Sequence, residues 1–150
     1  VTRQLIEVYE EYNAGALATM AVPDDHVDRY GIIAGENWAP RMHRIRTLIE
    51  KPAVGTAPSN LAVIGRYVLP PRIFDYLADT PRGADSEIQL TDALQRLARD
   101  TALIGYEFEG KRHDIGDKVG FLKCNIQYAL AREDIGAEIR EYLKELVENT

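Results

Sequence analysis

The sequence is poor in cysteine and has no long hydrophobic run. Cys124 is its one cysteine, so an internal disulfide is excluded, and its apolar helical surroundings predict a small buried thiol. The apolar stretches are far shorter than the roughly 18 residues that cross a bilayer. Residues 1–4 also lack the basic-then-apolar layout of a signal peptide. We therefore expect a cytoplasmic protein that has no membrane partner.

Several catalytic motifs are missing as well. The sequence has no Cys or His pair at zinc-ligand spacing, no Gly-x-Ser-x-Gly elbow and no Gly-x-x-x-x-Gly-Lys phosphate loop. His26 and His43 stand alone, on a predicted turn and a predicted exposed strand, and we expect both at the surface. These absences argue against zinc enzymes, hydrolases with a serine elbow and NTPases with a phosphate loop.

Acidic residues outnumber basic ones, and the net charge is −6. The acids are interspersed along the chain, so electrostatic repulsion disfavours nucleic acids and anionic membranes as partners, although a local site can still bind a small anion. A chain of 150 residues with 45% hydrophobic and 28% charged residues has the size and balance of one ordinary domain with a real core.

Hydrophobic periodicity predicts helices that alternate with strands. Helices are predicted at about 2–12, 72–78, 88–98, 119–131 and 135–147, with a helical turn at 23–27. Strands are predicted at 15–22, from 32 onward, at 42–50, 61–69 and 103–108. Thr2 and Ser86 are candidate N-caps. A hairpin turning at 35–37 makes the sheet mixed, so we expect an α/β fold with helices flanking a mixed sheet.

Asp114 is the strongest candidate for chemistry. It follows a predicted strand in the glycine-bounded loop 110–116, where α/β sheets commonly present functional groups to a ligand. Carboxylate oxygens suit Mg²⁺, which takes one or two of them from protein and the rest from phosphate and water. A loop aspartate between glycines is also a common turn former, and both interpretations stay open. Asp117 is expected to cap the next helix.

Glu50 and Lys51 end a predicted strand just before Pro52, which favours an extended Lys51. The ammonium group suits a phosphate, and the carboxylate suits paired sugar hydroxyls. Neighbouring residues of a strand point to opposite faces, so the alternative is two solvated side chains. A shared ligand would require a twist or a bulge at this point.

Two glycines are candidates for close approach of a ligand to the backbone. Gly31 precedes a strand, where plain turn geometry is the alternative. Gly65 interrupts the apolar run 61–69, and a glycine inside a strand marks a bulge or a close backbone approach. Arg66 and Tyr67 follow it and serve either the pocket or the fold.

Four blocks occur together in one order: Glu-Lys-Pro at 50–52, SNLAVIGRYVL at 59–69, EIQLTDA at 87–93 and GKRHDIGDK at 110–118. From about residue 2 to residue 146 the sequence resembles the bacterial UTP-glucose-1-phosphate uridylyltransferases, or UDP-glucose pyrophosphorylases. The family's opening glycine-rich nucleotide loop is absent, so the chain resembles the C-terminal half of such an enzyme. The resemblance implies a Rossmann-like nucleotidyltransferase (nucleotide-diphospho-sugar transferase) fold, with 1–150 as its C-terminal, sugar-binding part.

The resemblance also implies roles for individual residues. Asp114 would bind Mg²⁺ together with an aspartate of the N-terminal half, although His113 stands where the family has tyrosine or phenylalanine. Glu50 would contact glucose hydroxyls, and Lys51 would lie beside the sugar phosphate and take part in catalysis with Asp114. Gly31 would make a backbone contact to the hexose.

Gly65 and Arg66 would line the same sugar pocket. The apolar residues of the 87–93 block have helix spacing and its polar residues suit a capped first turn, so we expect this block to be mainly structural. The implied substrates are UTP and glucose 1-phosphate, with Mg²⁺ as cofactor and, by analogy, a homo-oligomeric assembly. The chain alone is expected to give little or no turnover. Sister enzymes that make dTDP- or GDP-sugars are an alternative, and so is a non-catalytic sugar-nucleotide-binding or assembly module.

Overall fold

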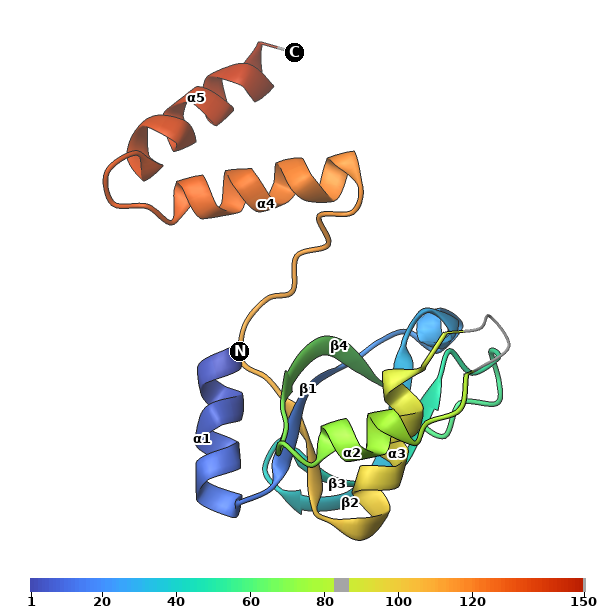
Figure 1. Cartoon of the computed structure of the whole chain (residues 1–150). Helices are drawn as coiled ribbons and strands as arrows, with labels where there is room; N and C mark the ends of the chain where they lie inside the picture. The colour runs from blue at the N-terminus through green and yellow to red at the C-terminus, as the bar shows by residue number, and fades with distance from the viewer. Residues whose placement is uncertain (83–86, 150) are drawn as a thin grey trace. The chain divides into compact units, whose positions relative to one another are not determined.

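The computed structural model describes residues 1–82 and 87–149, and these fall into two compact units, Val1–Glu109 and Gly110–Thr150. The first unit contains, in order, α1 (Thr2–Tyr12), β1 (Gly15–Ala21), the 3-10 helix η1 (Asp24–Arg29), β2 (Gly31–Ala39), β3 (Met42–Glu50), β4 (Leu61–Val68), α2 (Ile73–Ala78), α3 (Leu90–Asp100) and β5 (Leu103–Glu107). The second unit contains α4 (Lys118–Leu130) and α5 (Gly136–Glu148) (Figure 1).

The strands of the first unit form a mixed sheet that closes on itself in the order β1-β4-β2-β3-β5. β5 closes the sheet because it pairs with β1 in parallel and with β3 antiparallel. The other neighbours, β1 with β4, β4 with β2 and β2 with β3, are antiparallel. The predicted combination of helices with a mixed sheet is therefore confirmed.

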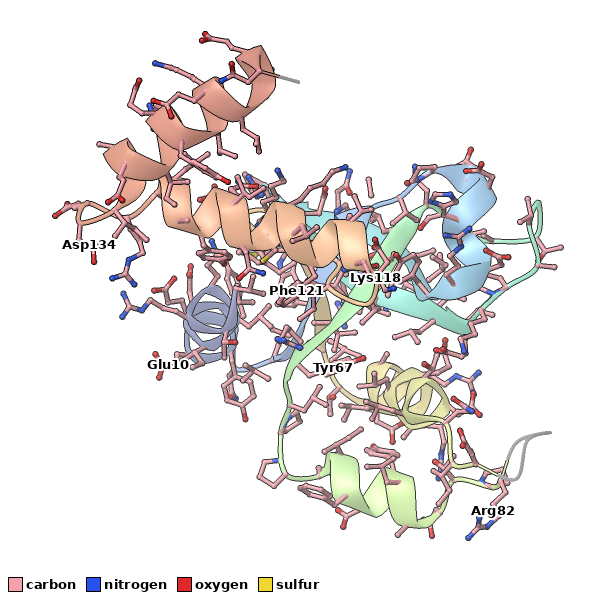
Figure 2. The ribbon with its side chains drawn as sticks, turned by 90° about the horizontal axis from the view of Figure 1, so that it is seen from above. Glu10, Tyr67, Arg82, Lys118, Phe121 and Asp134 are labelled. Atoms are coloured by element: carbon pink, nitrogen blue, oxygen red, sulfur yellow. The ribbon has the colours of Figure 1, made fainter. Side chains whose placement is uncertain are left out.

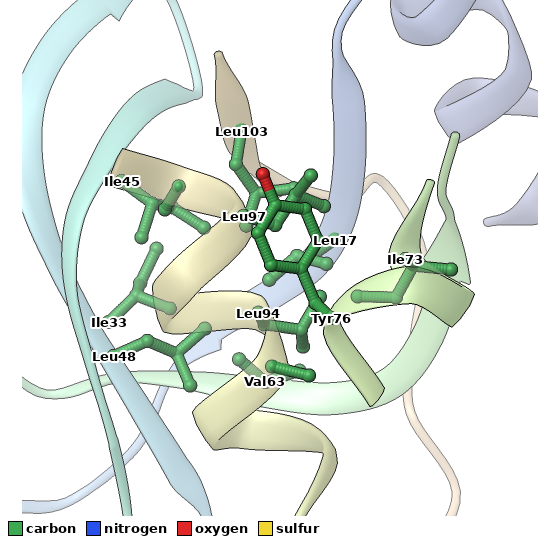
Figure 3. Packing of buried hydrophobic residues seen from close by; sticks show 12 residues of the cluster. Leu17, Ile33, Ile45, Leu48, Val63, Ile73, Tyr76, Leu94, Leu97 and Leu103 are labelled. Atoms are coloured by element: carbon green, nitrogen blue, oxygen red, sulfur yellow. The ribbon is translucent and has the colours of Figure 1, made fainter. Parts of the chain in front are cut away.

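Alternate residues of β1 face two hydrophobic clusters, as expected for a strand covered on both sides. Ala16 and Ala18 pack in the cluster that contains Leu5 and Val8 of α1. Leu17 packs in a second cluster, together with residues of α2 and α3. Figure 3 shows the large side chains of this second cluster. Figure 1 shows α1 and α3 on different sides of the strands. Three residues of the second cluster, Leu48, Val63 and Leu94, also line the candidate site described below.

Leu97 of α3 provides a test of this packing, because its side chain is fully buried in the second cluster. Replacing Leu97 with alanine removes buried methyl groups and leaves a cavity, so we expect a loss of about 2–5 kcal/mol in the free energy of unfolding. Val54 is 57% exposed and serves as the control, since Val54→Ala should cost under about 0.5 kcal/mol. Urea denaturation measures both. Equal losses would contradict the assignment of this core.

Most predicted elements form, but the hairpin turns later than expected. Residues 35–37 belong to β2, and the turn lies next to Arg41, which has a left-handed φ of 64°. β2 and β3 stay paired past residues 35–37, as far as Ala39↔Met42, with one register shift between Ala34 and Gly35. At Gly35 an added Cβ would lie 1.9 Å from the Arg44 carbonyl oxygen, so this glycine permits the close pairing rather than the turn.

The predicted caps and surface positions need correction in several places. Val1, not Thr2, occupies the N-cap of α1, and Gln89 occupies that of α3, while Ser86 lies outside the described residues. His43 is half-buried rather than exposed, since its Nε2 lies 2.7 Å from Glu107 Oε1. β4 is buried at its start and exposed at 65–67, so it is not the continuously buried strand that its composition predicts.

In the second unit the predicted helix cap is confirmed. Asp117 accepts hydrogen bonds from the backbone N–H groups of Val119 and Gly120, both at 2.9 Å, and so satisfies two free donors at the start of α4. Cys124 is half-buried and not buried as expected. Within the described ranges, no helix combines the length and apolar character needed to cross a bilayer.

Candidate functional site

A pocket of about 190 Å³ opens in the first unit, and it gathers residues from η1, β2, β3, β4 and α3. Its lining is Arg29, Tyr30, Gly31, Leu48, Glu50, Val63, Gly65, Tyr67, Thr91 and Leu94. Apolar side chains thus form part of the wall, and a carboxylate, a hydroxyl, a phenol and a guanidinium supply polar groups, as small-molecule sites require. Hollows of about 400 and 380 Å³ on α4 and α5 are larger, but no predicted site residue is among the residues given as their lining.

Gly31 and Glu50 meet because they are paired in the register of β2 and β3. A Cβ added at Gly31 would lie 3.1 Å from Glu50 Oε2 and 3.6 Å from Thr91 Oγ1. The absence of a side chain therefore keeps the space in front of the carboxylate open. Gly31 is not among the described residues with positive φ, so turn geometry does not require a glycine here. The close approach of the Glu50 carboxylate to its backbone is the reason for a small residue at this position.

Gly65 lies in a wide irregularity of the β1–β4 pairing, where the register passes from Leu17↔Tyr67 to Thr19↔Val63. Its φ of +73° is in the left-handed region, which glycine adopts without steric cost. An added Cβ would find nothing within 4 Å, so the space beside Gly65 is open. Arg66 does not line the pocket; it is exposed, and its Nη1 donates to the Gly65 carbonyl at 3.0 Å.

Tyr67 and Arg29 add polar groups to the pocket wall. Burial, and then the charge of Glu50, raise the pKa of Tyr67 above its ordinary value, so the phenol stays protonated at neutral pH and can donate a hydrogen bond. Tyr67 projects from β4 (Figure 2). Arg29 ends η1 and is the lining residue with a permanent positive charge. The pocket therefore offers both acceptor and donor groups to a ligand.

Lys51 follows Glu50 but does not line this pocket. Its φ of 43° lies in the left-handed region, so the extended geometry expected from Pro52 is wrong. The N–H of Lys51 donates to the Tyr30 carbonyl at 3.0 Å, which holds the chain in this turn at the end of β3. A non-glycine residue in this region costs about 1–3 kcal/mol, and such strain is concentrated at functional sites. The backbone therefore leaves the extended geometry of β3 at Lys51.

Asp114 belongs to the second unit and is 62% exposed. Its Oδ1 accepts from the Gly116 N–H at 3.0 Å, and its Oδ2 lies 3.5 Å from Arg112 Nη2. A hollow of about 280 Å³ is lined by Asp114 and, among others, Lys111, Arg112 and Lys123. The carboxylate and these cations together suit an anionic ligand with a bound cation.

The carboxylates and other metal-binding side chains near Asp114 determine how Mg²⁺ could be held. Among the residues that the structure describes, no three His, Cys, Asp or Glu side chains gather closely enough to hold a metal ion by themselves. Asp114 is an exposed carboxylate with lone pairs left over from its contacts to Gly116 and Arg112. Mg²⁺ takes one or two protein carboxylates and completes its shell with phosphate and water, so this residue fits the role of a single ligand.

Thr91 is one lining residue to which the sequence pattern gives no site role, since the 87–93 block is expected to be mainly structural. Its hydroxyl donates to Glu50 Oε2 at 2.5 Å. Arg29 is a second lining residue for which the sequence predicts no site role. In the sequence, Thr91 and Asp92 stand at the start of an amphipathic helix. This pattern is typical of helix N-termini in general, so it does not indicate a binding residue.

Comparisons with known proteins identify the family of the chain. UTP--glucose-1-phosphate uridylyltransferase 2 of Staphylococcus saprophyticus is 48% identical over 144 residues, which cover 96% of this chain and 50% of the relative. The chain thus spans about half the length of the curated relatives it matches.

Solved structures give the same result. A UTP-bound UGPase from Acinetobacter baumannii has a TM-score of 0.80 at 39% identity and covers 95% of this chain and 49% of its own. A UDP-glucose pyrophosphorylase complexed with UDP-glucose has a TM-score of 0.80 at 40% identity over 87% and 49% of the two chains. The family model described as nucleotidyl transferase matches residues 2–130. The chain therefore belongs to the nucleotidyl transferase family.

Proposed function

We propose that the chain is the C-terminal, sugar-binding part of a UTP-glucose-1-phosphate uridylyltransferase, with residues 1–150 as part of one nucleotidyltransferase domain. The observation that carries the proposal is the pocket of the first unit, where Gly31, Glu50 and Gly65 converge. The names of the relatives and the bound UTP and UDP-glucose of the solved structures support the same substrates. The proposal includes a cytoplasmic location and, by analogy with the family, a homo-oligomeric assembly.

The reaction joins two anions, so positioning and charge compensation carry its rate. An oxygen of glucose 1-phosphate attacks the α-phosphorus of UTP, and pyrophosphate leaves. Glu50 accepts hydrogen bonds from glucose hydroxyls, while the open backbone at Gly31 and Gly65 lets the ring approach. Lys51 offsets phosphate charge from the twisted end of β3, and Arg66 supports the pocket beside Gly65.

Asp114 is the residue of this chain that would hold Mg²⁺. When bound, the ion would neutralise phosphate charge and thereby stabilise the transition state. The second protein ligand, the glycine-rich nucleotide loop and most contacts to uracil belong, in this proposal, to the half of the relatives that the chain does not cover.

The proposal is tested with this chain alone and with a completed enzyme, in which the chain is joined to the half that the relatives carry in addition. We expect the chain alone to bind glucose 1-phosphate by calorimetry but to give little or no turnover. The completed enzyme should release pyrophosphate from UTP and glucose 1-phosphate in the presence of Mg²⁺. Release from dTTP or GTP at equal rates would favour a sister enzyme, and binding without any turnover would favour an assembly module. Full turnover by the chain alone would refute the division of labour.

A further inference from the structure

Thr91 lies in the first turn of α3, and its side chain is buried, with 8% exposure. Its hydroxyl donates to Glu50 Oε2 at 2.5 Å. Within the described part of the chain, no other hydrogen bond to the Glu50 carboxylate is present. The donor therefore comes from a different element than the carboxylate, which stands at the end of β3.

Gln95, one helical turn after Thr91, fixes α3 against β3. Its Oε1 accepts from the Leu48 N–H at 2.6 Å, and its Nε2 donates to the Arg46 carbonyl at 3.2 Å. Residues four apart share one helix face, so Thr91 and Gln95 reach the same strand. β5 pairs with Met42–Arg44 of β3, and the hydrogen bonds from Thr91 and Gln95 hold the part of β3 that follows. The Thr91 hydroxyl is therefore held at a set position relative to the strand that carries Glu50.

A carboxylate that is free to rotate loses conformational freedom when it binds a ligand, which weakens binding. The Thr91 hydroxyl occupies Oε2 and leaves Oε1 to accept from a ligand. Gly31 keeps the adjacent space clear, since an added Cβ would lie 3.1 Å from Oε2.

We infer that Thr91 is a positioning residue that sets the Glu50 carboxylate for the hydroxyl groups of a sugar phosphate. The inference rests on the proposed function, because it assigns a partner to the same pocket. On this inference the 87–93 block does more than start α3, because Thr91 contributes to substrate binding through Glu50.

The test compares Thr91→Val, which keeps the shape but removes the hydroxyl, with Thr91→Ser, which keeps the hydroxyl. In the completed enzyme we expect Thr91→Val to raise the Kd and KM for glucose 1-phosphate about tenfold with the KM for UTP unchanged. Thr91→Ser should stay within about twofold of wild type. The ¹³C signal of the Glu50 carboxyl carbon should move in Thr91→Val and stay in place in Thr91→Ser.

Thr80 provides a matched control, because it is also buried, with 6% exposure, and its hydroxyl donates to the Tyr76 carbonyl at 2.6 Å. Thr80→Val should lose stability without a change in sugar-phosphate binding. Wild-type binding by Thr91→Val, or equal weakening in all three variants, would overturn the inference. If wild type binds no glucose 1-phosphate although the Glu50 signal moves in Thr91→Val alone, the contact stands and the proposed function fails.

Discussion

Replacing Asp114 with asparagine is expected to lower the Mg²⁺-dependent turnover of the completed enzyme about a thousandfold. Asparagine keeps the shape and can still accept from the Gly116 N–H, which Asp114 Oδ1 accepts at 3.0 Å, so the local turn should persist. It removes the negative charge that a hard cation prefers. The expected signature is a higher Mg²⁺ requirement as well as a lower kcat, measured by pyrophosphate release across an Mg²⁺ titration.

Asp117→Asn is the matched control, since it removes one carboxylate from the same segment. Asp117 accepts from the N–H groups of Val119 and Gly120, and asparagine caps a helix about as well as aspartate. Its turnover and Mg²⁺ requirement should therefore stay within about twofold of wild type. An Asp114→Asn enzyme that matches Asp117→Asn would show that Asp114 is a turn former, the alternative that the sequence left open.

Periodicity predicts the order and type of the elements of the first unit because its strands and helices have buried apolar residues, and burial leaves a regular pattern. It failed where pairing is irregular. The turn near Arg41 and the bulge opposite Ala18 depend on register, which two distant segments decide together. The 61–69 run looked buried throughout because it is apolar, yet Gly65 and its neighbours bulge outward. No local pattern distinguishes such a bulge from a continuous strand.

The sequence indicates part of the pocket lining but none of the contacts within the pocket. Gly31, Glu50 and Gly65 line one pocket, whereas Lys51 and Arg66 are their neighbours in sequence and do not line it. Thr91 joins Glu50 across 41 residues of chain. A hydrogen bond between a helix and a strand so far apart in sequence follows from the way α3 packs on β3, and a single sequence contains no record of that packing.

Glu50→Gln is expected to raise the Kd of the completed enzyme for glucose 1-phosphate about a hundredfold. Hydrogen bonds to a charged group contribute about 1.5–3 kcal/mol each, and the glutamine amide loses the charge and can accept through a single oxygen. Because Thr91 already donates to one carboxylate oxygen, the amide must turn its oxygen either to Thr91 or to the sugar. UTP binding should be unchanged, and calorimetry with each substrate separately measures both effects.

Glu36→Gln controls for the loss of one negative charge in the same hairpin. Glu36 is exposed on β2 and pairs with Arg46 at 3.1 Å, and such surface ion pairs contribute little. Both variants change the net charge from −6 to −5, so any long-range effect on an anionic ligand is shared. A Glu50→Gln protein that binds glucose 1-phosphate as tightly as Glu36→Gln would remove Glu50 from the site. The pocket would then have to recognise its ligand through Arg29, Tyr67 and backbone groups, which favour an anion over a sugar ring.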